Sequence, residues 1–213
     1  MKTPKDDVRS ARNELRQALR ERLIAAREAL DPGQVQAASV RIERSLEQLL
    51  SRLSPRVVGY CWPYRGEFDC RPLMARWLRA AAGRRAALPV IVAPATAMPF
   101  RQWTPDSAMS EGRFGIPIPA SGADIVPDLL LMPVNGFDDQ GYRLGYGGGY
   151  FDRTLAALAP RPVAVGIGFE LARVASIDPG PFDIPMDYVV TEAGILTPSA
   201  GATTAGSQPR NSS

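Results

Sequence analysis

The sequence has no histidine among its 213 residues. This absence excludes Ser-His-Asp and Cys-His catalysis, histidine general bases and histidine-ligated zinc sites. Any metal ion would have to be held mainly by oxygen ligands, which favours Mg²⁺ over zinc or copper. The missing residue type therefore removes several classes of enzyme before any motif is considered.

Cysteine and long apolar runs are also scarce. Cys61 and Cys70 are the two cysteines, and their spacing matches neither a CxxC pair nor a zinc framework. The N-terminal residues contain no apolar core of a secretion signal, so we expect both thiols to be reduced. The longest apolar run, residues 86–95, contains two prolines and falls far short of the ~20 residues of a membrane span. These absences predict a soluble, cytoplasmic protein with no membrane partner.

Charge and composition are close to those of an average soluble domain. Lys and Arg number 25 and Asp and Glu 22, so the net charge of +3 does not by itself indicate a nucleic-acid partner. Hydrophobic residues make up 45% of the chain, which is enough for a buried core. We expect residues 1–197 to form a single domain. Residues 198–213 contain almost no large apolar side chains and are expected to form a disordered tail.

Helix and strand patterns alternate along the chain. Two helices are predicted first, over residues 7–30 and 34–53, from apolar residues spaced three or four apart. Their predicted buried faces are Leu15, Leu19, Leu23, Ala26 and Leu30 in the first helix, and Val40, Leu46, Leu49, Leu50 and Leu53 in the second. Strands are predicted at 56–60, 86–92, 99–103, 128–132, 162–167 and 188–191, and further helices at 72–82 and 150–159. The continuous apolar run at 128–132 is typical of a parallel strand buried on both faces, so we predict an α/β fold with a layered sheet.

A second stripe on the first helix consists of arginines. Arg9, Arg12, Arg16 and Arg20 recur with the helical period beside the apolar stripe. Three interpretations stay open at this point. The stripe could be a solvated face, an RNA-binding surface without interleaved aromatic residues, or a clamp that brings arginines to a phosphate from a distant part of the chain.

The strongest motif is the glycine-rich segment 141–153, which follows the predicted buried strand and opens a helix. Four of the five residues 145–149 are glycines, which let a ligand approach the backbone amides closely. A helix N-terminus adds free N–H groups and a positive dipole end, so the segment predicts an anion site, most simply for phosphate. It matches neither a Walker A loop nor GxGxxG, because no Gly-Lys-Ser/Thr closes it and Tyr150 stands where the last glycine would be. The alternative is a plain tight turn.

Three charged residues near this segment are candidates for binding phosphate or metal. Arg143 could contact a phosphate with two parallel hydrogen bonds. Asp152, in the first turn of the following helix, is either a Mg²⁺ ligand or a carboxylate favoured by the helix dipole. Asp187 opens a late strand and is either a metal ligand or an acid at the strand edge.

Residues 133–155 resemble the signature of the 5-formyltetrahydrofolate cyclo-ligase family over its whole length. Leu15-Arg16, residues 66–69, residues 114–117 and residues 183–187 agree with the family in order and spacing, so the resemblance covers about 9–191. It implies a single-domain, three-layer α/β/α sandwich around a mainly parallel sheet. It also implies Mg²⁺-dependent conversion of 5-formyltetrahydrofolate and ATP to 5,10-methenyltetrahydrofolate, ADP and phosphate, through a phosphorylated formyl group.

The resemblance also implies a role for each matching residue. Arg143 and Tyr150 would take part in catalysis, Trp62 and Glu67 would contact the folate, and Asp152 and Asp187 would hold Mg²⁺. The residues implied for ATP binding are Arg12, Arg16, Arg143, Leu144, Gly145, Tyr146, Gly147, Gly148, Gly149, Tyr150 and Phe151. The implied partners are the folate and ATP, bound by a monomer that needs no nucleic acid.

Four positions depart from the family pattern. The family usually has lysine at Arg12, glutamine near Ala172, tyrosine at Phe151 and histidine at Phe182. None of these changes removes a phosphate-binding or metal-binding group. They leave open a paralogue that binds folate or nucleotide without turnover or acts on another small molecule, and the basic first helix leaves open an RNA-associated module.

Overall fold

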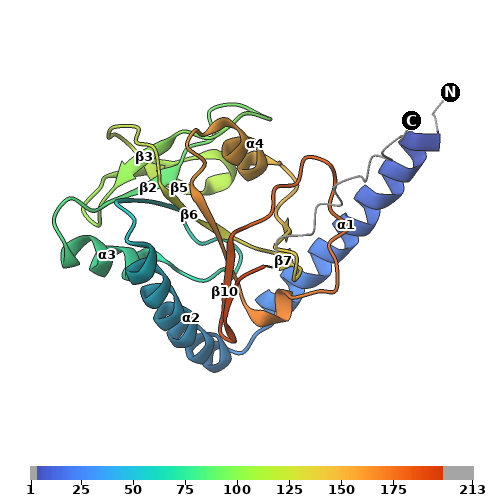
Figure 1. Cartoon of the computed structure of the whole chain (residues 1–213), viewed down its shortest axis with the longest axis horizontal. Helices are drawn as coiled ribbons and strands as arrows, with labels where there is room; N and C mark the ends of the chain where they lie inside the picture. Colours follow the sequence, from blue (N-terminus) through green and yellow to red (C-terminus); the bar gives the residue numbers. More distant parts are fainter. Residues whose placement is uncertain (1–3, 199–213) are drawn as a thin grey trace, which may run out of the picture.

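A large sheet runs through the computed structural model, which describes residues 4–198 (Figure 1), and it has seven strands. The strand order is β11-β10-β9-β6-β1-β2-β3, and the five inner strands are parallel, while β3 and β11 pair antiparallel at the two edges. The strands are β1 Val57–Tyr60, β2 Arg85–Pro89, β3 Phe100–Trp103, β6 Leu129–Pro133, β9 Val163–Ile167, β10 Tyr188–Thr191 and β11 Gly194–Leu196. The predicted mainly parallel sheet is confirmed. Apart from Pro198, the segment expected to be disordered lies outside the described residues.

Helices cover both faces of this sheet. The helices are α1 Pro4–Glu28, α2 Pro32–Leu53, α3 Arg71–Ala80 and α4 Tyr150–Ala157. Along β6, Leu129 and Leu131 point into the core formed with α2 and α3, whereas Leu130 and Met132 point into the core formed with α4. Because side chains alternate across a strand, an uninterrupted apolar run requires cover on both sides. The single-domain, three-layer α/β/α sandwich is therefore confirmed.

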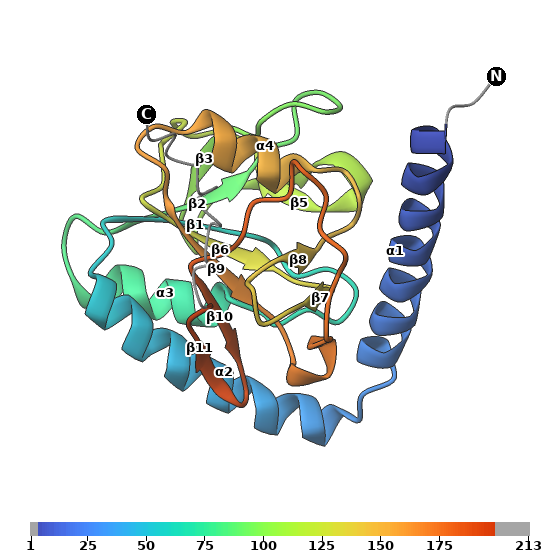
Figure 2. The ribbon, with the colours of Figure 1, turned by 45° about the vertical axis from the view of Figure 1, so that its right-hand side comes forward.

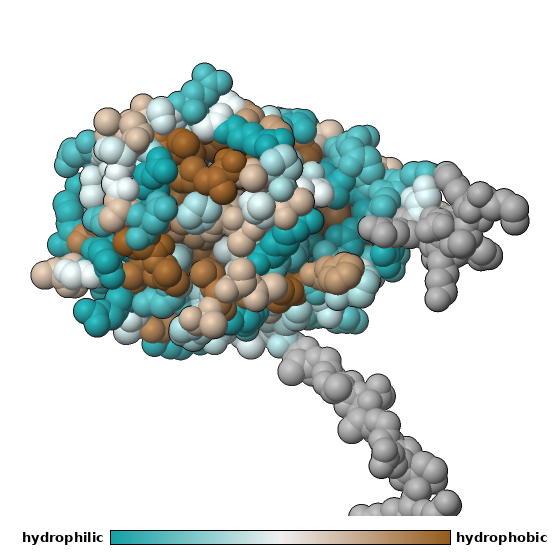
Figure 3. Space-filling view, turned by 90° about the horizontal axis from the view of Figure 1, so that it is seen from above, coloured by the Kyte–Doolittle hydropathy of each residue, from teal (hydrophilic) through white to brown (hydrophobic). Residues whose placement is uncertain are grey.

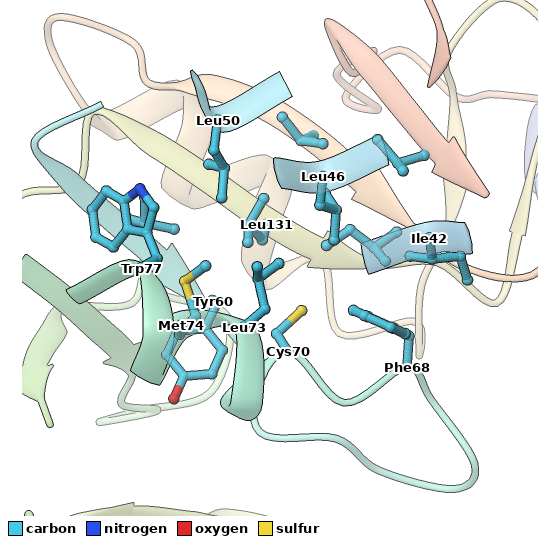
Figure 4. Close-up of a cluster of buried hydrophobic side chains, with 14 of the residues drawn as sticks. Ile42, Leu46, Leu50, Tyr60, Phe68, Cys70, Leu73, Met74, Trp77 and Leu131 are labelled. Carbon is cyan, nitrogen blue, oxygen red and sulfur yellow. The ribbon is translucent and has the colours of Figure 1, made fainter. Parts of the chain in front are cut away.

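The larger core lies under α2 (Figure 4). This helix begins with a capping box in which Asp31 and Gln34 bond each other's backbone N–H groups, and Pro32 follows the cap. Its buried residues are Ala38, Ile42, Leu46, Leu49 and Leu50. The predicted inward position of Val40 is wrong, because Val40 is 59% exposed. Ala38 and Ile42 continue the four-residue spacing back from Leu46, and Val40 falls between them on the outer side.

Helix α1 stands beside the rest of the domain rather than over the sheet (Figure 2). Its apolar contacts come from its second half, where Leu23 and Ile24 are buried and the helix packs against the short 3₁₀ helix η2, Glu170–Ala172. The predicted buried positions of Leu15 and Ala26 are wrong, because Leu15 is 71% exposed and Ala26 is exposed as well. The face that α1 turns to the protein covers loops at the sheet edge, and arginines occupy much of it.

Two short hairpins complete the described structure. β4 Met109–Glu111 pairs with β5 Pro117–Pro119, next to the turn η1 Arg113–Gly115, and β7 Gly136–Phe137 pairs with β8 Arg143–Leu144.

On the face seen from above, apolar patches are separated by hydrophilic residues (Figure 3). Within residues 4–198, no helix is both long and apolar enough to cross a membrane.

Candidate active site

The candidate site lies at the carboxyl edge of the parallel strands. β1, β6 and β9 end there, and they lead into residues 61–70, 134–149 and 168–172. α1 crosses the same edge, since Arg27 bonds the backbone oxygen of Val134 and α1 contacts η2. In open α/β sheets this edge is where ligands bind. The topology therefore brings the predicted folate residues, the glycine-rich segment and the arginine stripe to one region.

The β7–β8 hairpin returns the chain to the start of α4 through the glycine-rich turn. Gly147 and Gly149 adopt positive φ angles of 91° and 64°, a conformation that other residues rarely adopt. Gly149 is the N-cap of α4, and no side chain caps the helix there. The first-turn N–H groups of α4 are thus left for another partner. This backbone has the form that an anion site requires, and phosphate binding at the turn stays a prediction.

Arg143 and Asp152 form a bidentate ion pair behind this turn. Two guanidinium nitrogens of Arg143 donate to the two carboxylate oxygens of Asp152, each at 3.1 Å. The side chains are 6% and 17% exposed, and the Ile184 N–H also donates to Asp152 at 3.1 Å. The Phe151 ring lies 5.4 Å from the guanidinium of Arg143. Arg143, the predicted phosphate-binding residue, and Asp152, the predicted metal ligand, therefore lie together, and each neutralises the charge of the other.

Two arginines of the α1 stripe, Arg16 and Arg20, face the protein. Arg16 donates to both carboxylate oxygens of Asp183, at 2.6 and 3.2 Å, and to the Asp178 carbonyl at 3.1 Å. Arg20 donates to the Gly145 carbonyl at 2.6 Å, within the glycine-rich turn. The solvated-face interpretation is therefore wrong for Arg16 and Arg20.

The charges at this end of α1 influence one another. Burial would raise the pKa of Asp183, but hydrogen bonds from Arg16 and the Gly180 N–H lower it below its usual range. Burial, together with the neighbouring charge of Arg16, lowers the pKa of Arg20. Arg12 lies at the same loop, since a Cβ on Gly180 would stand 3.3 Å from its guanidinium. Arginines are thus concentrated here, with Arg16 held by the carboxylate of Asp183 and Arg20 by the carbonyl of Gly145.

Glu67 is joined to the glycine-rich turn by a hydrogen bond. The Tyr146 hydroxyl donates to Glu67 at 2.8 Å, and the Tyr64 N–H donates to the other carboxylate oxygen at 3.1 Å. Burial raises the pKa of Glu67 above its usual range, although these bonds and the charge of Arg27 act in the opposite direction. The predicted folate residue and the predicted ATP residue therefore touch directly.

Trp62 lies in the same loop as Glu67 but makes a different contact. The guanidinium of Arg71 lies 4.3 Å from the centroid of its ring, and Arg71 is itself bound to Asp69. A small cavity of about 10 Å³ next to this loop is lined by Cys61, Glu67, Phe68, Cys70, Leu131, Pro133 and Ile167. Burial raises the pKa of both thiols, so they stay protonated at neutral pH.

Asp187 lies towards the amino ends of the strands. It accepts from Arg161, with 3.0 Å to each carboxylate oxygen, and from the Ala164 N–H at 2.7 Å. It thereby fastens the start of β10 to the start of β9. The structure does not bring Asp187 into contact with Asp152, and residues 4–198 contain no cluster of three or more acidic or cysteine side chains suited to a metal ion. The predicted metal role of Asp187 stays a prediction.

Three further residues organise the site and were missed from the sequence. The buried Arg27 donates to the Arg65 carbonyl, to Asn135 and to the Tyr146 hydroxyl, at 3.0, 2.9 and 3.2 Å. Arg27 follows Arg20 by seven residues, so the helical period of the stripe could have revealed it. The buried Asp138 accepts from the backbone N–H groups of Gln140, Tyr142 and Ile177, which fixes the turn before Arg143. No sequence signal beyond the motif marked Asn135 or Asp138.

Replacing Glu67 by glutamine is expected to stabilise the protein at neutral pH. A glutamate whose folded pKa is raised stabilises the fold below its unfolded pKa and loses that contribution as pH rises through the folded pKa. The gain of the Glu67→Gln variant should thus be largest near pH 7.5 and shrink towards about pH 4, the usual range of glutamate. Thermal unfolding across this pH range measures the difference. The exposed Glu111→Gln is the matched control, and an equal pH dependence in the two variants would contradict the prediction.

A layered α/β/α fold with glycine-rich and charged loops at the carboxyl edge of its sheet defines a class of α/β enzymes that bind ligands there. Residues 12–192 match the model of the 5-formyltetrahydrofolate cyclo-ligase family. The chain therefore belongs to that family, as its signature segment indicated.

Individual relatives agree with this assignment. A 5-formyltetrahydrofolate cyclo-ligase of Escherichia coli K12 is 30% identical over 177 residues, covering 79% of this chain and 96% of the relative. The Haemophilus influenzae protein of the same name is 26% identical over 180 residues, covering 80% and 94% of the two chains. The solved 5,10-methenyltetrahydrofolate synthetase of Aquifex aeolicus is 25% identical, with a TM-score of 0.74 over 93% of this chain and 96% of that one. The synthetase of Mycoplasma pneumoniae, at 23% identity and a TM-score of 0.67 over 83% and 98%, matches in fold.

Proposed function

We propose that this chain converts 5-formyltetrahydrofolate and ATP to 5,10-methenyltetrahydrofolate, ADP and phosphate. The observation that carries the proposal is the buried Arg143 directly behind an uncapped, glycine-rich helix N-terminus. Together with Arg12, Arg16 and residues 144–151, this region would hold the phosphates of ATP. Family membership supplies the folate substrate class.

The proposed reaction has two steps. The formyl oxygen attacks the γ-phosphorus of ATP, the bond from that phosphorus to the bridging oxygen breaks, and ADP leaves. N10 of the folate then attacks the formyl carbon, loses its proton, and closes the ring as inorganic phosphate leaves with the former formyl oxygen. Phosphoryl transfer depends mainly on positioning and on neutralising phosphate charge, which arginines and backbone amides provide. The absence of histidine is compatible with this chemistry.

In this proposal, Arg143 and Tyr150 act at the transferred phosphoryl group. Arg143 would bind it in the bidentate manner in which it now binds Asp152. Tyr150 is the first residue of α4, and its ring lies against Gly148, where a Cβ would be 2.6 Å from the ring. Tyr150 therefore shapes the turn whose amides would face the phosphates.

One of the two predicted acidic residues, Asp152, fits a Mg²⁺ ion that arrives with the nucleotide. Mg²⁺ is usually bound by one or two protein carboxylates, with phosphate oxygens and waters as its other ligands. Asp152 meets this requirement beside the turn. Asp187 lies towards the amino ends of the strands and is proposed as a second ligand from the family resemblance alone. Each is bound to an arginine here, so holding the metal would require an exchange of partners. When bound, the ion would neutralise phosphate charge.

Glu67 and Trp62 are the proposed folate contacts. Both lie on the loop after β1, across from the glycine-rich turn, and Glu67 already bonds that turn through Tyr146. A carboxylate there can accept hydrogen bonds from the N–H groups of a pterin, and an indole can pack on its flat face. All of these residues belong to one chain, so we propose that the monomer is active.

A turnover assay tests the proposed function. Purified protein is mixed with 5-formyltetrahydrofolate, ATP and Mg²⁺, and the near-ultraviolet absorbance of the methenyl product is followed. We expect product that requires ATP and stops when EDTA removes the metal. Nucleotide binding without ATP consumption in the presence of the folate would instead identify a non-catalytic binding paralogue.

Arg16→Ala is expected to raise the KM for ATP about ten-fold, the typical loss of one charge-assisted contact. The substitution also releases Asp183, which Arg16 holds against α1. Initial rates at varied ATP measure the effect. Arg22→Ala is the matched control, because Arg22 is exposed on the same helix. A KM for ATP unchanged by Arg16→Ala would contradict a phosphate role for this arginine.

A further inference from the structure

Three segments meet in one short chain of hydrogen bonds. Arg27 comes from α1, Tyr146 from the glycine-rich turn, and Glu67 from the loop after β1. A guanidinium nitrogen of Arg27 lies 3.2 Å from the Tyr146 hydroxyl, and that hydroxyl lies 2.8 Å from a carboxylate oxygen of Glu67. These residues are far apart in sequence, and the hydroxyl group of Tyr146 joins Arg27 to Glu67.

The direction of each hydrogen bond follows from the chemistry of the groups. A guanidinium has only donors, so the Tyr146 hydroxyl must accept from Arg27. The hydroxyl has one proton, which is therefore free for Glu67, an acceptor when ionised. Arg27 consequently fixes which way Tyr146 donates, and the carboxylate of Glu67 receives a bond oriented by a buried cation.

Arg27 is held too firmly to be a mobile surface charge. It is 5% exposed, and its other bonds go to Asn135 at 2.9 Å and to the carbonyls of Arg65 and Val134 at 3.0 and 3.4 Å. Among the residues whose side chains the structure describes, no carboxylate forms an ion pair with it, and Tyr146 links its guanidinium to the carboxylate of Glu67. The Tyr146 ring rests edge-on against Tyr64, with centroids 5.7 Å apart, and is 45% exposed. The buried, immobile guanidinium of Arg27 thus holds the hydroxyl of Tyr146, whose ring extends towards solvent.

We propose that Tyr146 is a positioning residue that couples the two substrate sites, so that binding at either site strengthens binding at the other. The inference rests on the proposed function, which assigns the turn to ATP and Glu67 to the folate. The backbone of Tyr146 belongs to the turn, while its hydroxyl orients Glu67. A ligand on one side fixes the shared hydrogen bonds, and the second ligand then has less ordering to impose. The coupling must be the same in both directions.

The experiment measures dissociation constants by isothermal titration calorimetry. The Mg²⁺ complex of the β,γ-imido analogue of ATP is titrated into the protein with and without saturating 5-formyltetrahydrofolate. In the unmodified protein the folate should tighten nucleotide binding about ten-fold, within the usual range of coupling between sites. In Tyr146→Phe, which keeps the ring and removes the hydroxyl, the ratio of the two constants should fall to about one. Tyr64→Phe, which removes the hydroxyl of the neighbouring ring, should keep the ratio of the unmodified protein.

The possible results separate this inference from the proposed function. A protein that turns over both substrates but shows no tightening overturns the coupling and leaves the reaction intact. The coupling is likewise overturned if Tyr146→Phe keeps the full ratio. A protein that binds neither ligand overturns the proposed function and the coupling with it. Loss of the ratio in Tyr146→Phe, with the ratio retained in Tyr64→Phe, supports the role of the hydroxyl.

Discussion

Arg143→Gln is expected to lower kcat/KM for methenyltetrahydrofolate formation about 1,000-fold, the upper part of the range for removing one preorganised electrostatic group. Arg143 has the required properties, because its side chain is 6% exposed, it begins β8 and it is held in a bidentate pair. The fold thus holds the guanidinium beside the turn, where it would stabilise phosphoryl charge once it exchanges Asp152 for the phosphate. Steady-state kinetics at saturating Mg²⁺ measure the loss.

The same substitution should also destabilise the fold, by roughly 1–3 kcal/mol, because Asp152 loses its bidentate partner and keeps the Ile184 N–H. Unfolding by denaturant measures this effect independently of activity. The matched control is Arg173→Gln, which removes an arginine paired with Asp139 on the surface. Arg143→Lys keeps the charge but loses the bidentate geometry, so its activity should lie between that of the unmodified protein and that of Arg143→Gln. Full activity in a folded Arg143→Gln would exclude the proposed catalytic role.

The layered fold was predictable because the helix and strand patterns alternate and one strand is apolar along its whole length. The apolar run at 128–132 could only be accommodated between two covering layers, and the structure has α2 on one side and α4 on the other. The position of α1 was not predictable in the same way. Its leucine stripe indicated an apolar buried face, yet α1 covers polar loops, where arginines find carbonyl and carboxylate acceptors. Leu15 is exposed and Arg16 faces inward for this reason.

The site was predictable as a list of groups, while most of their partners were not. The glycines at 145–149 indicated an unusual backbone conformation. Gly147 and Gly149 adopt it, with positive φ angles that favour glycine. By contrast, the pairing of Arg143 with Asp152 depends on how the turn folds back. The contact of Arg27 with Tyr146 joins residues 119 apart in sequence. Such contacts depend on where the topology places acceptors, which residue type and spacing do not encode.

Asp152→Asn should lower turnover about 100-fold or more, a loss in the range for one electrostatic group in an active site. The change is isosteric and removes one negative charge. Asparagine can keep the bond from the Ile184 N–H through its side-chain oxygen, so the fold should persist. Rates at varied Mg²⁺ should show that the variant needs more metal, because a neutral amide is a weaker ligand than a carboxylate. Calorimetry with the imido analogue, with and without Mg²⁺, should show a smaller effect of the metal on nucleotide binding.

Two further variants decide what the carboxylate of Asp152 does. Asp139→Asn breaks an exposed ion pair outside the site and should leave the Mg²⁺ requirement unchanged. Asp187→Asn removes a carboxylate that also bonds Arg161 and the Ala164 N–H, so it tests the second proposed ligand. If Asp187→Asn loses stability but keeps the normal Mg²⁺ requirement, Asp187 serves the strand edge and Asp152 is the protein's metal ligand. If Asp152→Asn unfolds readily and its remaining folded fraction turns over at the normal rate and Mg²⁺ requirement, Asp152 serves only to neutralise the buried Arg143.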